Sequence, residues 1–220
     1  MSYSSVKNHT EKFDATLVAV SKTKPLSDIL NLYESGQRHF GENRVQELRQ
    51  KYEDLPKDIL WHQIGTLQTN KVKYIAPFVH LIHSVDSLKL AKTIIKEAQK
   101  VDRCIDVLVQ IKVAQEETKH GIDQKESLTI VEELVKLNSP FIRLRGIMAM
   151  ASFSNDQELV KAEFLLAKEI FDSLNDQYFA DKDHWDILSM GMSGDYLLAM
   201  ECGSTMVRVG SLIFGSRNYD

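Results

Sequence analysis

Hydrophobic positions alternate along the chain between two kinds of segment. Short apolar runs rich in β-branched residues predict strands, and each is followed by a segment whose apolar residues recur at helical spacing. The runs that predict strands are Thr16–Val20, His39–Phe40, Leu60–Ile64, Val79–Ser84, Ile105–Ile111, Phe141–Ile147, Trp185–Ser189 and Met206–Val209. Eight strands, each trailed by a helix, predict an α/β fold of the (β/α)₈ TIM-barrel type.

The segments between these runs carry the helical signals. After the first run Leu26, Ile29 and Tyr33 share one helical face, and Gly36 stands where a C-terminal glycine cap belongs. Further helices are predicted at Arg44–Tyr52, Asn70–Ile75, Leu88–Ala98, Leu128–Val135, Asp156–Leu174 and Tyr196–Glu201, with Asp123 and Glu126 spaced as a capping box. No linker-like segment interrupts the alternation, so we expect one domain over residues 1–220.

An open, doubly wound sheet is the alternative architecture. Such a sheet usually carries a GxGxxG motif after its first strand to bind a dinucleotide. Here the first predicted strand is followed by Ser21–Pro25, which contains no glycine, and no Walker motif occurs elsewhere. The sequence therefore favours the barrel.

Composition and charge narrow the class of protein. The 220 residues include 27 basic and 31 acidic side chains, a formal charge of −4, which argues against nucleic acid as a partner. No apolar stretch approaches the ~20 residues of a membrane span, and the N-terminus has no apolar signal region. Cys104 and Cys202 are far apart and fit reduced intracellular thiols. We expect a cytoplasmic monomer without a membrane or nucleic-acid partner.

Candidate chemistry lies where the predicted strands end, because barrel active sites form there. Lys22 follows the first strand and has the same parity as Val18 and Val20, so it points into the barrel mouth if those valines fill the interior. A desolvated lysine there has a lowered pKa, and its neutral amine can form a Schiff base with a carbonyl. The alternative is a solvated lysine just past a strand end.

Two turns rich in glycine and serine follow the last two strands, at residues 189–195 and 208–215. Glycines let backbone amides approach an anion, so two such turns at neighbouring positions form a candidate phosphate cradle. Arg208 interrupts the last apolar run, and a buried guanidinium must find an acceptor. An ion pair with Glu42 or Asp195 is the structural alternative to a ligand contact.

The seven histidines show no metal-binding pattern by their spacing. His80 and His83 are three apart on a predicted strand, which places them on opposite faces, so no metal site is expected. His62 lies near the end of the third strand and is the better pocket candidate. The pair Glu116 and Glu117 is expected in a solvated loop.

Six motifs together resemble the pyridoxal-phosphate homeostasis protein family. They are AVSKTKP at 19–25, FGEN at 40–43, WHQIG at 61–65, RGIMA at 145–149, GMSGD at 191–195 and GSTMVRVGSLIFG at 203–215. They follow the order of the family from about residue 16 onward. The chain departs from the family in having only about 15 residues before its first strand, where members commonly carry a longer helix.

The resemblance implies a barrel like the N-terminal domain of alanine racemase (fold type III) that binds the vitamin B6 cofactor pyridoxal 5′-phosphate. Lys22 matches the Schiff-base lysine, and Arg208 matches the arginine that faces the pyridine nitrogen. The phosphate-binding turns match Ser193, Gly210 and Ser211. Pocket lining is implied for Asn43, His62, Ser84 and Met148.

Two functions follow from that resemblance. The first is a carrier or regulator of the cofactor with little or no catalysis, whose partners are pyridoxal phosphate, amino acids and cofactor-dependent apo-enzymes. The alternative is an amino-acid racemase, which needs a second acid/base group from an added domain. The chain ends five residues after Gly215, which leaves no room for that domain and favours the carrier. A barrel that binds another phosphorylated metabolite would fit an unreactive Lys22.

Overall fold

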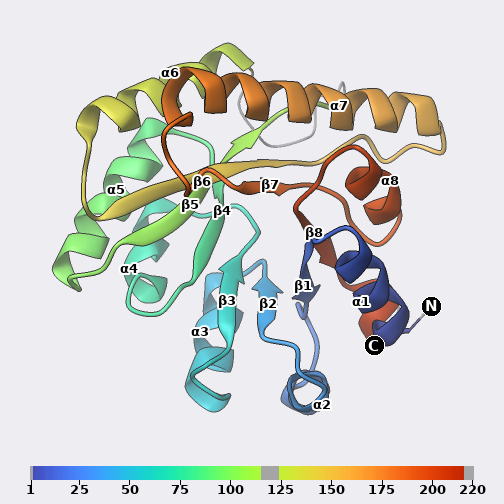
Figure 1. Cartoon of the computed structure of the whole chain (residues 1–220). Helices are drawn as coiled ribbons and strands as arrows, with labels where there is room; N and C mark the ends of the chain where they lie inside the picture. The colour runs from blue at the N-terminus through green and yellow to red at the C-terminus, as the bar shows by residue number, and fades with distance from the viewer. Residues whose placement is uncertain (1, 115–123, 216–220) are drawn as a thin grey trace.

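The computed structural model describes residues 2–114 and 124–215, and its strands form one closed barrel in sequence order (Figure 1). Neighbouring strands are parallel throughout, and β1 pairs with β8 to close the sheet. The strands are β1 (Thr16–Val20), β2 (His39–Glu42), β3 (Leu60–Gln63), β4 (Leu81–Val85), β5 (Ile105–Ile111), β6 (Ile142–Ala149), β7 (Ile187–Ser189) and β8 (Met206–Val209). The barrel prediction is confirmed, and the open sheet is wrong because closure leaves no free edge strand.

Helices lie outside the strands, with α7 the longest of those described (Figure 1). They are α1 (Tyr3–Lys12), α2 (Leu26–Glu34), α3 (Val45–Asp54), α4 (Val72–Ile75), α5 (Leu88–Lys100), α6 (Gln124–Leu137), α7 (Gln157–Leu174), α8 (Tyr196–Glu201) and α9 (Ser211–Phe214), with a 3₁₀ turn at Thr69–Lys71 and a π-helical turn at Asn175–Phe179. In the described ranges no helix combines the length and the apolar character that crossing a membrane requires.

Local capping chemistry explains several of these boundaries. Gly36 ends α2 with φ +94°, a conformation that glycine adopts without steric cost, so its predicted capping role is confirmed. Asp156 begins α7 by accepting hydrogen bonds from the amides of Glu158 and Leu159. The predicted capping residue Asp123 and the pair at 116–117 lie outside the described residues.

Helix α1 was not among the predicted elements. Its Val6 is fully buried against Leu17, Val207 and Val209, on the outer wall where β1 meets β8. The short leading segment therefore covers the seam at which the barrel closes, and its Tyr3 hydroxyl reaches the Gln37 side chain below β2.

Two apolar layers hold the barrel together. The interior layer takes one residue from each of six strands, namely Val18, Leu81, Leu108, Met148, Ile187 and Met206. The larger layer lies between strands and helices and includes the fully buried Trp61 and Phe164. At the N-terminal ends of the strands, Asp106 accepts ion-pair hydrogen bonds from Arg143 and Arg145, both at 2.7 Å. The C-terminal ends are left open as a cavity.

Candidate functional site

A cavity of about 260 Å³ opens at the C-terminal ends of the strands, and we call it the strand-end cavity. Segments at the ends of β1, β2, β3, β6, β7 and β8 all contribute to its wall. Its lining residues are Val20, Lys22, Lys24, Asn43, Ile64, Met150, Met192, Ser193, Arg208, Gly210, Ser211 and Gly215. The position is the one at which barrel proteins build their sites.

The charge of this lining is one-sided. It includes three cationic side chains, those of Lys22, Lys24 and Arg208, and no carboxylate is among the lining residues. Val20, Ile64 and Met150 supply apolar wall between them. The cavity therefore suits a ligand with an apolar body and an anionic group.

A tight turn after β1 places Lys22. The amide of Lys24 donates to the Ser21 carbonyl at 3.0 Å, and Thr23 between them has φ +65°, which is unusual for a β-branched residue. The Thr23 amide donates to the Glu47 carboxylate at 2.6 Å, which holds the turn. The Lys24 ammonium donates to the Phe214 carbonyl at 2.8 Å and so ties the turn to the C-terminal segment.

A buried ionic group supports this turn from behind. The Lys51 ammonium donates to the Ser21 carbonyl and to the Glu42 carboxylate, each at 2.8 Å, and the Ser21 hydroxyl donates to Glu42 at 2.6 Å. Burial raises the pKa of Glu42 to about 7, against the opposing effects of Lys51 and Ser21, and its Oε2 has no hydrogen-bond partner. The alternative in which Glu42 forms an ion pair with Arg208 is wrong, because the Glu42 carboxylate is paired with Lys51.

Arg208 lies on the inner side of β8, opposite Val207 and Val209, which pack on the outer wall. Its guanidinium is buried and donates to the Ser189 hydroxyl at 2.7 Å and to the Ala149 carbonyl at 3.1 Å. Burial lowers the pKa of Arg208 to about 10, with the charge of Asp195 acting in the opposite direction, so the group stays protonated at neutral pH. A buried guanidinium bonded to neutral acceptors favours an anion or a further acceptor from a ligand.

The two predicted turns meet at the cavity. The Gly210 amide donates to the Ser193 hydroxyl at 3.2 Å, and both residues line the cavity beside Ser211. Gly191 has φ +93°, and a Cβ there would lie 2.6 Å from the Ala199 Cβ, so only glycine fits the first turn. Ser193, Gly210 and Ser211 therefore lie together on the cavity lining, at the positions that the phosphate cradle was predicted to occupy.

A chain of hydrogen bonds runs from Arg208 through the barrel interior. Ser189 and His83 Nδ1 are 3.1 Å apart, His83 Nε2 and His62 Nδ1 2.8 Å, and His62 Nε2 and His39 Nδ1 2.9 Å. Burial lowers the pKa of His62 and His83 far below the ordinary value, so both rings are neutral. This interior chain, His39–His62–His83–Ser189–Arg208, supports the arginine from the opposite end of the barrel.

Six of the nine residues expected at the site line the strand-end cavity, and they are Lys22, Asn43, Ser193, Arg208, Gly210 and Ser211. The other three lie elsewhere. His62 belongs to the interior chain and Met148 to the interior apolar layer. The Ser84 hydroxyl donates to the Gly65 carbonyl at 2.7 Å, and Gly65 packs so closely on Asn43 that a Cβ would lie 2.6 Å from its carbonyl oxygen. Ser84 thus supports Asn43 from behind.

Sequence reasoning missed two lining residues that alternation could have found. Ile64 and Met150 line the cavity, and each is two residues beyond a residue that was expected there, His62 and Met148 respectively. Residues two apart share a face of a strand, so His62 and Met148 lie on the same face as the two lining residues. The prediction therefore chose the correct face but placed the site one inward-facing residue too deep in the barrel.

The comparisons with known proteins agree on one family. The family model of the alanine racemase N-terminal domain matches residues 2–218. A pyridoxal phosphate homeostasis protein of Aquifex aeolicus is 42% identical to this chain over 206 residues, which cover 93% of this chain and 88% of that protein. A pyridoxal phosphate homeostasis protein of Haemophilus influenzae is 39% identical, and the match covers 92% of this chain and 85% of that protein. The solved structure of PipY from Synechococcus elongatus with PLP bound is 35% identical, with a TM-score of 0.82 over 92% of this chain and 93% of that one.

Proposed function

The chain belongs to the pyridoxal phosphate homeostasis protein family, and on that basis we propose that it binds pyridoxal 5′-phosphate in the strand-end cavity and holds it in reserve for other proteins. The observation that carries the proposal is the lining itself. It joins a strand-end lysine, a buried arginine and a hydroxyl-lined turn, with no carboxylate among the lining residues.

Each part of the cofactor has a fitting group on the lining. Ser193, Gly210 and Ser211 would hold the phosphate, and Arg208 would donate to the pyridine nitrogen. Lys22 would bond the aldehyde carbon through its amine. When bound, the cofactor supplies a reversible covalent link to an amine and an electron sink beside it.

The same lining disfavours efficient catalysis. Arg208 donates a hydrogen bond and stays charged, so it opposes protonation of a pyridine nitrogen that it faces and weakens the electron sink. Two-base racemisation needs a second acid/base group across from Lys22. Among the described lining residues no tyrosine, histidine or carboxylate takes that position, and Lys24 is bonded to the Phe214 carbonyl. We propose a carrier that does little or no chemistry on amino acids.

The proposal also names partners and a setting. Amino acids would compete with Lys22 for the cofactor aldehyde and release it, and cofactor-dependent apo-enzymes would receive it. We propose that the protein acts as a monomer in the cytoplasm, where such enzymes and reduced thiols are found. Cys104 and Cys202 form no disulfide with each other.

A transfer assay tests this function. The cofactor-loaded protein, offered to a cofactor-dependent apo-enzyme as its only source, is expected to restore that enzyme's activity. In parallel, the loaded protein incubated with L-alanine is expected to show neither racemisation nor α-deuterium exchange at enzyme-like rates. Rapid racemisation that a Lys22→Ala substitution abolishes would overturn the carrier in favour of the racemase.

The phosphate cradle gives a separate prediction. Hydrogen bonds to a charged group contribute about 1.5–3 kcal/mol each, so Ser193→Ala is expected to weaken pyridoxal phosphate binding by roughly tenfold or more. Pyridoxal, which lacks the phosphate, should bind the original protein and Ser193→Ala equally weakly. Exposed Ser35, replaced by alanine, is the control. Equal affinity of the original protein for the two compounds would exclude this cradle.

A further inference from the structure

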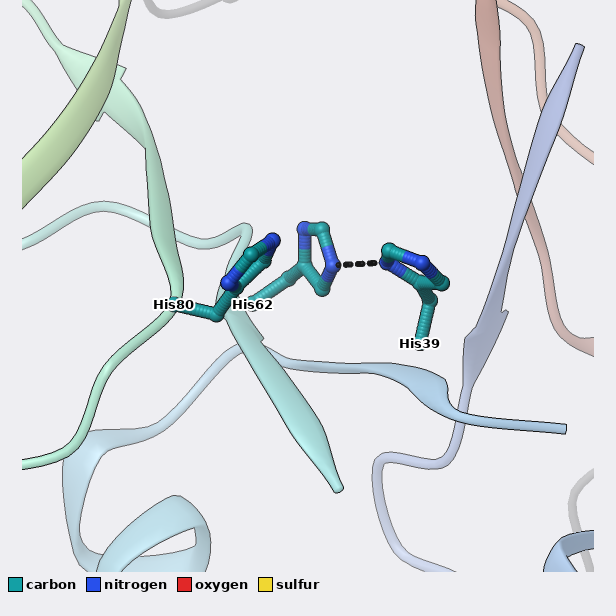
Figure 2. Close-up of side chains that lie close together, drawn as sticks. All are labelled: His39, His62 and His80. Carbon is teal, nitrogen blue, oxygen red and sulfur yellow. Dashed lines mark hydrogen bonds between the residues drawn. The ribbon is translucent and has the colours of Figure 1, made fainter. Parts of the chain in front are cut away.

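Three histidines meet at the end of the barrel opposite the strand-end cavity. His39 begins β2, His62 lies in β3 and His80 precedes β4, so the three come from adjacent strands (Figure 2). Their ring centroids form a nearly regular triangle, with separations of 5.2, 5.4 and 5.7 Å. We call these residues the histidine cluster. Spacing along the chain misses it because each member is supplied by a different strand.

The expectation that His80 and His83 face opposite sides of a strand is wrong. His80 lies just before β4, where strand alternation does not apply, and the ring of His62 contacts both rings, with centroids 5.4 Å from His80 and 5.1 Å from His83. One histidine, His62, therefore joins the cluster to the interior chain.

The ring nitrogens of the histidine cluster are nearly as close together as the ligands of a metal site. One ring nitrogen from each residue lies within 4.8 Å of the others, and His62 Nε2 and His39 Nδ1 are 2.9 Å apart. A tetrahedral zinc ion with bonds of about 2.0–2.1 Å needs ligand nitrogens roughly 3.3 Å apart. The required shifts are small, and half-buried His39 and His80 leave a route from solvent.

The surroundings orient the central ligand. His62 Nδ1 is bonded to His83 Nε2 at 2.8 Å, which leaves His62 Nε2 directed at the other two rings. A ligand histidine typically uses its second ring nitrogen in this way, which fixes the ring and its tautomer. The interior chain thus supplies outer support for a bound ion.

The ligand type determines which class of metal ion the histidine cluster suits. Each of the three residues presents one ring nitrogen to the cluster, and the nitrogen of a neutral imidazole that bears no hydrogen offers a lone pair to a metal ion. Arg103, Arg143 and Arg145 near His80 are cationic, but Asp106 accepts bonds from the last two. The three candidate ligands are all imidazoles, which suit zinc, nickel or copper and not magnesium or calcium.

We propose that His39, His62 and His80 form a binding site for a divalent transition-metal ion of the zinc class, with water completing the coordination. In the tautomer that can bind the ion, His62 Nδ1–H donates to His83 Nε2 and His39 Nδ1–H donates to His62 Nε2. When the ion binds at His62 Nε2 and His39 Nδ1, the His39 proton moves from Nδ1 to Nε2 of the same ring. Every ring is neutral before and after, so binding releases no net proton from the ligands. The site is separate from the strand-end cavity, and its occupancy does not depend on the proposed cofactor function.

Metal titration tests this proposal on protein purified without a histidine tag and treated with EDTA. Zn²⁺ is expected to bind with one ion per chain by calorimetry, and Co²⁺ is expected to give the visible absorption of a tetrahedral site. His80→Gln should weaken the binding of Zn²⁺ and the binding of Co²⁺ by at least about 100-fold each. His184→Gln, outside the cluster, should bind as the original protein does.

Folding must be checked in the same variants. The far-UV circular dichroism and thermal unfolding of metal-free His80→Gln should match those of His184→Gln, since His80 is only partly buried. His39→Gln provides a second removal of one ligand. Absence of Zn²⁺ binding by the original protein would overturn the site, and so would Zn²⁺ binding by both cluster variants that is as tight as that of the original protein.

Discussion

Replacing Lys22 with alanine is expected to abolish covalent attachment of pyridoxal phosphate to this protein. Lys22 lines the strand-end cavity and continues the inward face of Val18 and Val20, so its amine enters the same space as Arg208. Lys24 lines the cavity too, but its ammonium donates to the Phe214 carbonyl and is oriented away from a bonding role. The loss should therefore be complete and not partial.

Two measurements separate covalent attachment from simple binding. The visible absorbance of the loaded protein should disappear in Lys22→Ala and in Lys22→Arg, and the second variant keeps the positive charge of the cavity. Borohydride reduction of the original protein followed by peptide mapping should place the adduct on Lys22. Lys24→Ala is the matched control and should keep the absorbance.

The contrary outcome is specific. An adduct that maps to Lys24, or full absorbance in Lys22→Ala, would show that the turn after β1 presents a different amine. Because Lys22 is only partly buried and Lys22→Arg preserves its charge, misfolding would not explain such a result.

Strand alternation predicted that Lys22 shares the inward face of Val18 and Val20, but it did not predict how deep the inward-facing side chains of other strands lie. Lys22 lines the cavity as its parity predicts, whereas Met148 lies below it and Met150 takes the position at the rim. The same shift separates His62 from Ile64. Depth depends on the stagger between neighbouring strands, and that register is set by contacts across the barrel which the local pattern does not contain.

Features made by closure of the barrel were also beyond local patterns. The partner of Arg208 on β8 is Ser189 on β7, and the interior chain continues from there to β4, β3 and β2. The histidines of the interior chain are far apart in the sequence, so no local pattern indicates that they contact one another. The short α1 was missed because its burial rests on Val6 and a few contacts with the β1–β8 seam.

The buried histidines are expected to make the metal-free protein sensitive to acid. Burial lowers the pKa of His39 to about 4 and those of His62 and His83 well below the ordinary value of 6.5. The unfolded chain therefore binds more protons than the folded one below about pH 6.5. Their stabilisation is fully present above that pH and is lost as pH falls toward the folded pKa values.

The size of the effect follows from His39. A shift from 6.5 to about 4 corresponds at pH 5 to about 2 kcal/mol of lost stability, and His62 and His83 add to it. Glu42 acts in the opposite direction, because an acid whose folded pKa is raised to about 7 stabilises the fold as pH falls from 7 toward 4.5. The histidines outnumber it, so the free energy of unfolding should fall between pH 7 and pH 5.

Urea unfolding at pH 7 and pH 5 in EDTA measures this difference without interference from bound metal. The fall in unfolding free energy should be about 2 kcal/mol smaller in His39→Gln, which removes one titrating ring, and unchanged in His184→Gln. His39→Gln also loses the hydrogen bond to His62, which lowers the unfolding free energy at pH 7 and at pH 5 alike. That loss cancels when the difference between the two pH values is taken. An equal fall in all three proteins would show that His39 titrates normally in the fold, and that burial does not hold the bottom of the interior chain neutral.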